Sequence, residues 1–369
     1  MKIKTITCHD VYNVGASLQA YALMRYLQKQ GHDVEIIDYK PDYLSGHYRL
    51  IGVDNPKYDF FFLKQVYILA KFPQRLMARI GKKKRNFDTF RKKYLKLTDK
   101  RYHNCQELLE NCPEAELYIA GSDQIWNPLY QNGKDEAFFL KFVPDFKKRI
   151  SYAASFATDE INIEDKEKMR NWLEKFDAVS VREESALSVL NSIGIKGMQV
   201  CDPVFLLSES DWEKMATGVY EKSYIFVYDF DNSSKINQMA VCISKKRGGD
   251  ILSAFPMHRC TKVIKDMGPL EFLGYVKGAE VIISNSFHAT AFSILFHKEF
   301  YVVDRIEAIN TRMRDLLKLV GLDDRLINNV EEIEDVKPIN WDEVDIRLKR
   351  NIDFSKKYLK SQTKEGIKE

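Results

Sequence analysis

The pattern of apolar and polar positions predicts alternating strands and helices from the start of the chain. Residues 2–7 are rich in β-branched side chains and predict a strand, and a loop with one glycine follows at 8–15. Apolar residues then recur at helical spacing over 16–27, and Gly31 stands where that helix would end. Residues 34–38 predict the next strand. A strand–loop–helix–strand unit of this length is typical of a parallel sheet.

The same alternation continues in two sets, which we expect to form two domains. The first set predicts strands at 117–120, 150–153, 178–181 and 198–201, with helices at about 164–175 and 183–192. The second predicts strands at 224–228, 280–284 and 300–303, with helices at 233–246, 269–277 and 288–296. We therefore expect an α/β fold of two Rossmann-like domains facing a cleft, with ligands beyond the carboxyl ends of the strands. The predicted segments are 1–206, 222–340, and a C-terminal helix and tail at 341–369.

Composition and charge exclude several classes of protein. The chain has 57 basic and 53 acidic residues, and such a balance argues against nucleic-acid binding. Residues 1–4 lead into a strand without the apolar core of a signal peptide, and no apolar run approaches the roughly 18 residues of a membrane span. The six cysteines are scattered without the spacing of a zinc site. We expect a cytoplasmic protein with free thiols, no metal and no nucleic-acid partner.

Residues 60–101 depart from the pattern because they mix apolar side chains with dense positive charge. Lysine and arginine fill 82–85 and recur at 91–93, so we expect a basic helical insertion in the first domain. One interpretation is a solvated helical surface. The other is a peripheral contact of 82–101 with the inner face of the membrane or with a lipid-diphosphate-linked acceptor. Clustered basic residues near a membrane contribute about 1 kcal/mol each.

The loop at 9–15, between the first strand and the first helix, is expected at the mouth of the cleft. It holds a single glycine, so it is not a GxGxxG pyrophosphate cradle, and a nicotinamide enzyme is not expected. Asp10 and Asn13 are candidates to hold a sugar or an anion near the helix N-terminus. The alternative is that Asn13 and Gly15 simply make the turn.

A second polar turn, 121–127, follows the strand at 117–120. Gly-Ser-Asp is a natural turn sequence, but a turn does not explain the Gln124, Trp126 and Asn127 that follow. An aromatic ring beside amide and carboxylate groups suits a sugar site, because the ring stacks on a pyranose while the polar groups bind its hydroxyls. The turn is no GxSxG nucleophile elbow, because the second glycine is absent. We therefore expect an acceptor site here, with Asp123 and with Trp126 beneath the sugar.

Arg182 stands where the strand at 178–181 gives way to a helix. A surface salt bridge is the ordinary role of such an arginine. At the carboxyl end of a strand that faces a cleft, however, a planar guanidinium suits bidentate binding of a carboxylate or phosphate. We therefore place Arg182 in an anion site.

The segment 284–288 lies between a strand and a helix and is the sharpest signal of the second half. Ser286 predicts an N-cap, which leaves free backbone N–H groups and the positive end of the helix dipole at this point. His288 in the first turn presents a ring nitrogen to an anionic ligand, although a structural histidine is the alternative. Four more polar side chains follow the next strand: Arg305, Asn310, Arg312 and Arg314.

Taken together, these motifs resemble the polysaccharide pyruvyltransferase family. No single motif is decisive, but the ordered set covers roughly residues 5–325, nearly the whole chain. The matching stretches are 12–23, 121–127, 155–157, 181–187, Asp202-Pro203, 284–288, and 310–312 through Gly321-Leu322 to Arg325.

The resemblance implies a GT-B-like pair of Rossmann-like domains, with the acceptor on the first and the donor on the second. It implies transfer of the enolpyruvyl unit of phosphoenolpyruvate to a hexose or N-acetylhexosamine of an exopolysaccharide or capsule precursor, forming a cyclic pyruvate ketal. In the family, Arg, Leu and His before a helix of the second domain hold the donor. The histidine corresponds to His288, but the other two positions are Ser286 and Phe287, so the usual donor arginine is missing.

Ketal formation calls for a cationic clamp on carboxylate and phosphate, an acid and a base, and for no cofactor or metal. We expect Arg182 with Arg312 or Arg305 to form the clamp and His288 to be the acid. Asp10 or Asp123 would orient or deprotonate the acceptor hydroxyl. Two alternatives remain open: a nucleotide-sugar glycosyltransferase of the same architecture, and a non-catalytic glycan- or anion-binding protein. The oligomeric state stays open.

Overall fold

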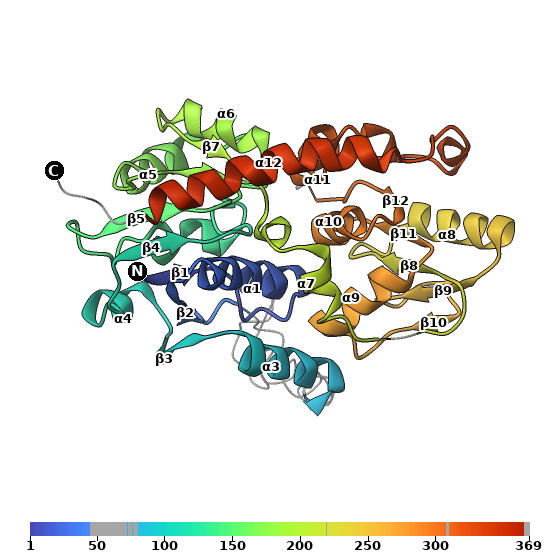
Figure 1. Cartoon of the computed structure of the whole chain (residues 1–369), viewed down its shortest axis with the longest axis horizontal. Helices are drawn as coiled ribbons and strands as arrows, with labels where there is room; N and C mark the ends of the chain where they lie inside the picture. Colours follow the sequence, from blue (N-terminus) through green and yellow to red (C-terminus); the bar gives the residue numbers. More distant parts are fainter. Residues whose placement is uncertain (45–71, 73–75, 77–79, 219, 308–309, 365–369) are drawn as a thin grey trace, which may run out of the picture.

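Two five-stranded sheets dominate the computed structural model, which describes residues 1–44, 72, 76, 80–218, 220–307 and 310–364 (Figure 1). The first sheet is entirely parallel, in the order β3-β2-β1-β4-β5. Its strands are β1 (Lys2–Ile6), β2 (Asp33–Tyr39), β3 (Leu97–Tyr102), β4 (Leu117–Ala120) and β5 (Lys148–Ser151). Successive residues Ile36 and Ile37 belong to different buried clusters, so both faces of the sheet are covered, as in doubly wound folds.

The second sheet repeats this topology with the order β10-β9-β8-β11-β12, again parallel. Its strands are β8 (Tyr224–Tyr228), β9 (Asp250–Ser253), β10 (Lys262–Val263), β11 (Val281–Ser284) and β12 (Glu299–Val302). Each sheet places its first strand in the centre, beside its second and fourth. The prediction of two Rossmann-like α/β halves is therefore confirmed, while the proposed domain boundaries stay predictions.

Most helices begin where a polar side chain satisfies the first backbone N–H groups. Asn13 caps α1, Ser208 caps α7 and Ser286 caps α10, as expected of short polar residues at that position. The helices of the first half are α1 (Val14–Lys29), α3 (Lys82–Tyr94), α4 (Cys105–Glu110), α5 (Ile163–Leu173), α6 (Glu184–Ser192) and α7 (Glu209–Glu213). Those of the second half are α8 (Ser234–Arg247), α9 (Pro269–Gly278), α10 (Phe287–Leu295), α11 (Thr311–Val320) and α12 (Trp341–Gln362). A minor pair, β6 (Ser180–Val181) and β7 (Met198–Gln199), precedes the 3-10 helix η5 (Pro203–Leu206).

The basic segment departs from the prediction at its end. The predicted helical insertion runs to residue 101, but α3 ends at Tyr94 and Leu97–Tyr102 forms the edge strand β3, in which Leu97 pairs with Ile36 of β2. Pairing with an exposed strand edge overrides local helix propensity here. The part of the insertion from 60 to 79 lies outside the described residues, apart from 72 and 76.

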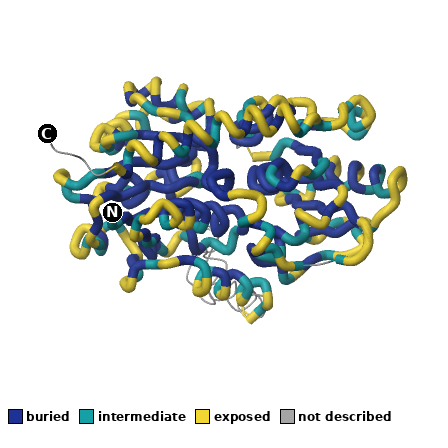
Figure 2. The backbone as a smooth tube through the Cα atoms, viewed as in Figure 1, coloured by how far each residue is buried: buried dark blue, intermediate teal, exposed yellow. Residues whose placement is uncertain are grey.

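The two halves share one continuous core where they meet. A single buried cluster contains Leu18 of α1, Phe226 of β8 and Phe292 of α10. The ring of Trp212 in α7 lies edge-on to that of Phe292, with centroids 5.1 Å apart. Figure 2 shows this buried region extending through both sheets and the helices between them. Apolar packing therefore holds the carboxyl ends of the two sheets opposite each other.

Helix α12 crosses from the second half back to the first (Figure 1). At its start, Trp341 stacks on His297 with ring centroids 4.6 Å apart. Near its end, the Tyr358 hydroxyl donates to the Ser151 carbonyl of β5 at 2.9 Å. The predicted C-terminal helix therefore contacts both halves.

Candidate active site between the two sheets

A cavity of about 440 Å³ lies between the carboxyl ends of the two sheets. We call it the interdomain pocket. Side chains from the loops after β1 and β4 line one wall, and side chains from α10, α11 and the loop after β12 line the other. Open α/β sheets bind ligands at this edge. The predicted cleft is therefore where the sequence placed it.

The first wall includes the N-terminus of α1. The Asn13 side chain accepts a hydrogen bond from Ala16 N at 3.1 Å, so it acts as the N-cap while lining the pocket. At Gly15, close packing against His288 leaves no space for a side chain. A Cβ at this position would lie 1.9 Å from Nδ1 of His288. The glycine therefore allows α1 and α10 to meet across the two halves.

The turn at 121–127 splits into a part that lines the pocket and a part that is buried. Asp123 lines the pocket with φ of 81°, in the left-handed region that non-glycine residues seldom adopt. Its Oδ1 accepts a hydrogen bond from Gln124 N at 2.9 Å. Such strain is often found at functional sites, where the surrounding structure holds it in place. Asp123 and Gln124 thus lie where the sequence predicted.

Trp126 and Asn127 belong to the buried part, and the structure contradicts their predicted sugar contacts. Trp126 is 0% exposed; its ring stacks on Phe139 at 5.5 Å, and its Nε1 donates to the Phe138 carbonyl at 3.1 Å. Asn127 is also 0% exposed, and its Oδ1 accepts from Leu129 N at 3.0 Å. Sequence spacing cannot separate an aromatic ring that meets a ligand from one that packs beneath the loop.

Asp10 likewise lies apart from the pocket lining. Its Oδ2 is 2.9 Å from Nζ of Lys40 and 3.2 Å from Nη2 of Arg101. Burial raises the pKa of Asp10, but Lys40 and Arg91 outweigh burial and lower it. A carboxylate held in its ionised form by these ion pairs is a poor proton acceptor. The structure therefore does not support Asp10 as the catalytic base.

The second wall is built around the N-terminus of α10. Ser286 caps the helix, and its Oγ accepts from Ala289 N at 3.5 Å. The first N–H groups of a helix have no intrahelical acceptor and carry the positive end of its dipole. His288, in this first turn, lines the pocket together with Ser286 and Phe287. The junction between β11 and α10 therefore presents N–H groups and an imidazole to a ligand.

Two predicted clamp arginines are engaged elsewhere. Arg182 lies outside the pocket lining, with its guanidinium 4.4 Å above the Phe287 ring and Nη1 donating to Asp202 Oδ2 at 2.7 Å. The structure contradicts its direct role, because Phe287 lies between it and the pocket. Arg305 does line the pocket, but its Nη2 lies 2.9 Å from Asp231 and 3.3 Å from Glu307.

Arg312 is the arginine of the pocket that meets no carboxylate in the described parts of the chain. The Gln124 amide is assigned with its oxygen toward this guanidinium, so that Nη2 and Nη1 donate at 2.8 and 3.2 Å. Nε is buried without a hydrogen-bond partner. Burial, followed by repulsion from Arg182, lowers the pKa of Arg312 to about 10, so the group stays charged at neutral pH. A buried cation that forms no ion pair suits an anionic ligand.

A comparison with protein-family models matches residues 13–306 to the family described as polysaccharide pyruvyl transferase. The chain belongs to this family. Comparison with curated protein sequences gave no match. The family indicates a transferase.

Solved structures show the same fold at low sequence identity. A protein from Listeria monocytogenes described as a UDP-N-acetylglucosamine 2-epimerase is 9% identical, with a TM-score of 0.52 over 98% of this chain and 90% of that one. S. aureus MnaA, in a structure with UDP, is 11% identical, with a TM-score of 0.51 over 99% and 98%. These likenesses establish the GT-B-like arrangement of this pyruvyl transferase family member and say nothing of its substrate.

Sequence reasoning missed the contact between Tyr130 and Glu307, which joins the two walls of the pocket. The Tyr130 hydroxyl donates to Glu307 Oε2 at 3.0 Å, across the two halves. No pattern in the sequence connects these positions. The sequence shows Asp202 only within a stretch that resembles the family. No pattern predicts that it lies 3.6 Å from His288 Nε2.

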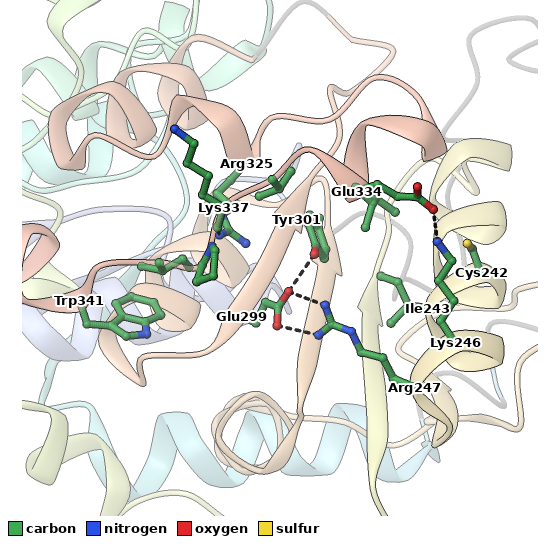
Figure 3. A pocket seen from close by; sticks show the side chains of 14 residues that line it. Cys242, Ile243, Lys246, Arg247, Glu299, Tyr301, Arg325, Glu334, Lys337 and Trp341 are labelled. Carbon is green, nitrogen blue, oxygen red and sulfur yellow. Dashed lines mark hydrogen bonds and ion pairs between the residues drawn. The ribbon is translucent and has the colours of Figure 1, made fainter.

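A second cavity, of about 530 Å³, lies beside β12, an edge strand of the second sheet (Figure 3). Glu299 opens β12 there and forms two hydrogen bonds with Arg247, at 2.7 and 3.0 Å. Lys246 pairs with Glu334 in the same cavity. Its two carboxylates are paired, while Arg325 and Lys337 leave the lining net positive. Unlike the interdomain pocket, this cavity is lined by α8, β12 and residues 325–341 of the second half alone. We take the interdomain pocket as the active-site candidate of this family member.

No group of three His, Cys, Asp or Glu side chains in the described residues is arranged to hold a metal ion. None of the helices in the described ranges has the length and apolarity to cross a bilayer.

Proposed function

We propose that the chain transfers the enolpyruvyl unit of phosphoenolpyruvate to a sugar of a cell-surface polysaccharide precursor, forming a cyclic pyruvate ketal and releasing phosphate. One observation carries the proposal: Arg312 is buried without a carboxylate partner in the described structure, in a pocket it shares with His288 and the N-terminus of α10. Phosphoenolpyruvate supplies a carboxylate and a phosphate, the two anions such a site binds. Membership of the family supports the same reaction.

The residues of the pocket divide the chemistry among them. Arg312 and the first N–H groups of α10 hold the donor anions, and His288 as imidazolium gives its proton to the methylene carbon. A sugar hydroxyl then adds to the carbon that bears the phosphate, and phosphate leaves by cleavage of the C–O bond. A second hydroxyl closes the ketal at the same carbon. Asp123 accepts a hydroxyl proton, while the other proton leaves with phosphate or restores His288.

The acceptor side of the pocket is polar. Gln124 and Asn132 present amides, and Tyr130 presents a phenol ring. These groups suit the hydroxyls of a hexose or N-acetylhexosamine. The proposal requires no metal or cofactor, because a cationic clamp, an acid and a base suffice.

The test is phosphate release from phosphoenolpyruvate with a panel of galactosides and N-acetylhexosamine glycosides, followed by mass spectrometry. We expect one sugar to gain the mass of a pyruvate less one water, in step with phosphate release. A parallel panel of lipid-diphosphate-linked sugars covers a membrane-bound acceptor. Absence of a pyruvylated product from both panels, together with no binding of phosphoenolpyruvate in calorimetry, would overturn the proposal.

The two alternatives predict different results in the same experiments. A nucleotide-sugar glycosyltransferase would bind a nucleoside diphosphate in the pocket and transfer a hexose instead of pyruvate. A non-catalytic binding protein would bind phosphoenolpyruvate or glycan without releasing phosphate. Titration with UDP and product analysis therefore separate all three functions.

A further inference from the structure

Asp202 is a fully buried carboxylate at the meeting point of three segments. It follows β7 and caps η5, with Oδ1 accepting from Val204 N at 3.0 Å. Its Oδ2 accepts from Arg182 Nη1 at 2.7 Å and from Ser122 Oγ at 3.3 Å. Its side chain is 0% exposed. A buried carboxylate with this many donors is fixed in place.

The same Oδ2 faces His288 from the other half of the molecule. The distance from Oδ2 to Nε2 of His288 is 3.6 Å, and Nε2 is buried without a hydrogen-bond partner. Catalytic hydrogen bonds are often this long before substrate binds. Because Nε2 is buried, a ligand in the pocket can reach only the remainder of the ring, which includes Nδ1. Gly15 lies beside Nδ1 and limits the movement of the ring on that side.

Asp202 places a negative charge beside the buried nitrogen of the ring. Burial raises the pKa of Asp202, but His288, Arg182 and the Val204 N–H outweigh burial and lower it below its ordinary range. Asp202 is therefore ionised at neutral pH. The other charged groups nearby are Arg182, which shares Oδ2 of Asp202, and Arg312 and Asp123, which line the pocket together with His288. Asp202 lies 3.6 Å from a ring nitrogen of His288.

We propose that Asp202 is a positioning residue: its carboxylate orients the His288 imidazole, keeps a proton on Nε2, and leaves Nδ1 to act as the proton donor. A buried carboxylate orients a catalytic histidine in this manner in other acid–base sites. Asp202 itself stays ionised throughout, and the proton that moves to the donor's methylene carbon comes from His288. The catalytic part of this inference rests on the proposed function, whereas the contact itself does not.

The first experiment measures the pKa of His288 directly, without any substrate. His288 is one of seven histidines, and its NMR signal is assigned with His288→Gln. In Asp202→Asn we expect its pKa to fall by about one unit or more, since an opposite charge at this distance favours the charged form. Ser122→Ala is the matched control, because it removes another donor to Oδ2 and keeps the carboxylate. An unchanged His288 pKa in Asp202→Asn would overturn the inference, even if activity were lost.

Gly15→Ala provides a second variant should Asp202→Asn fail to fold. It keeps every atom of Asp202 and His288, but its Cβ would occupy space 1.9 Å from Nδ1 and must displace the ring. We expect a folded protein in which the contact is lost and the pKa of His288 changes in the same direction as in Asp202→Asn. A wild-type pKa in Gly15→Ala would show that ring placement does not depend on this contact and would contradict the inference.

Kinetics then test the role in catalysis. With the acceptor identified, Asp202→Asn should lower kcat by about 10²-fold or more while KM for phosphoenolpyruvate changes little, as expected for loss of a tuned general acid. An imidazolium donor is lost as pH rises through its pKa, so the alkaline limb of the kcat profile should move to lower pH in the variant. A rise in KM alone would contradict the positioning role. Absence of turnover in the wild type would refute the proposed function, while the NMR titration would still decide the Asp202–His288 contact.

Discussion

Arg312 and Arg314 lie two residues apart on α11, yet their surroundings differ because residues at this spacing point to different faces of a helix. Arg312 is buried in the pocket and contacts the Gln124 amide. The Arg314 side chain is 49% exposed and reaches Asp159 at 3.4 Å. The tertiary position of each guanidinium, and not its residue type, decides which one can hold an anion.

Replacing Arg312 by Gln should weaken phosphoenolpyruvate binding by about 10- to 100-fold, because a hydrogen bond to a charged group contributes about 1.5–3 kcal/mol. Isothermal titration calorimetry measures the change. Arg314→Gln is the matched control, on the same helix with the same substitution, and should bind as the wild type does. Equal affinity of both variants for phosphoenolpyruvate would show that Arg312 does not bind the donor.

At the scale of elements, ion pairs join the carboxyl ends of β1, β2 and β3 beside the pocket. Asp38 at the end of β2 receives hydrogen bonds from His9 Nε2 at 3.2 Å and from Arg101 Nε at 2.9 Å. Burial raises the pKa of Asp38, but these two partners outweigh burial and lower it to about 2. Asp10 shares Arg101 with it. The residue predicted as a catalytic base therefore belongs to a network that ties strands together.

The Asp38 pKa implies a pH dependence of stability. A depressed folded-state pKa stabilises the protein above the unfolded value of 3.8, and this contribution is lost as pH falls toward about 2. The free energy of unfolding should therefore decrease by about 2 kcal/mol between about pH 4 and pH 2 from this group. Urea titrations across that range measure it. Asp38→Asn should remove this component, whereas Asp33→Asn, at the exposed start of β2, should leave it nearly unchanged.

Helix α3 shows how the basic segment is used within the protein. Lys82 lies 2.8 Å from Asp266, and Asn86 Nδ2 donates to the carbonyl of the same residue, so α3 contacts the second half. Lys84 pairs with Asp88, and Arg91 lies 3.6 Å from Asp38. Three of the seven basic side chains at 82–85 and 91–93 are thus paired with carboxylates of the protein. A membrane contact through 82–101 remains a proposal, which vesicle sedimentation with and without anionic lipid would test.

At the scale of the whole molecule, α12 and the shared core hold the two halves in one arrangement. Leu359 near the end of α12 is 1% exposed, and Ser355 Oγ accepts from Cys201 N at 2.8 Å, close to Asp202. The helix therefore supports both β5 and the segment that carries the proposed positioning residue.

Leu359→Ala should lower the free energy of unfolding by about 2–5 kcal/mol, because it leaves a cavity in a packed interface. Ile346→Ala, on the same helix at a position that is 53% exposed, should change it by less than about 0.5 kcal/mol. Chemical unfolding curves compare the two. Equal effects of both substitutions would show that the end of α12 is not packed as the structure describes.

The alternation of strands and helices in two halves and the cap at Ser286 follow from the sequence alone, because they depend on local periodicity and turn chemistry. The strands β3, β9 and β10 were not among the predicted strands. Four of the predicted site residues, Asp123, Gln124, His288 and Arg312, line the pocket, and their roles stay predictions.

Only the tertiary structure decided which polar and aromatic residues at those strand ends face the pocket. Trp126 and Arg182 have local sequences as suggestive as those of Gln124 and Arg312, yet one packs in the core and the other lies behind Phe287. Their positions depend on contacts between residues far apart in the chain, as between Gly15 and His288, and local pattern carries no information about such contacts. The edge strand β3 differs from its prediction for the same reason, since pairing with β2 outweighs local propensity.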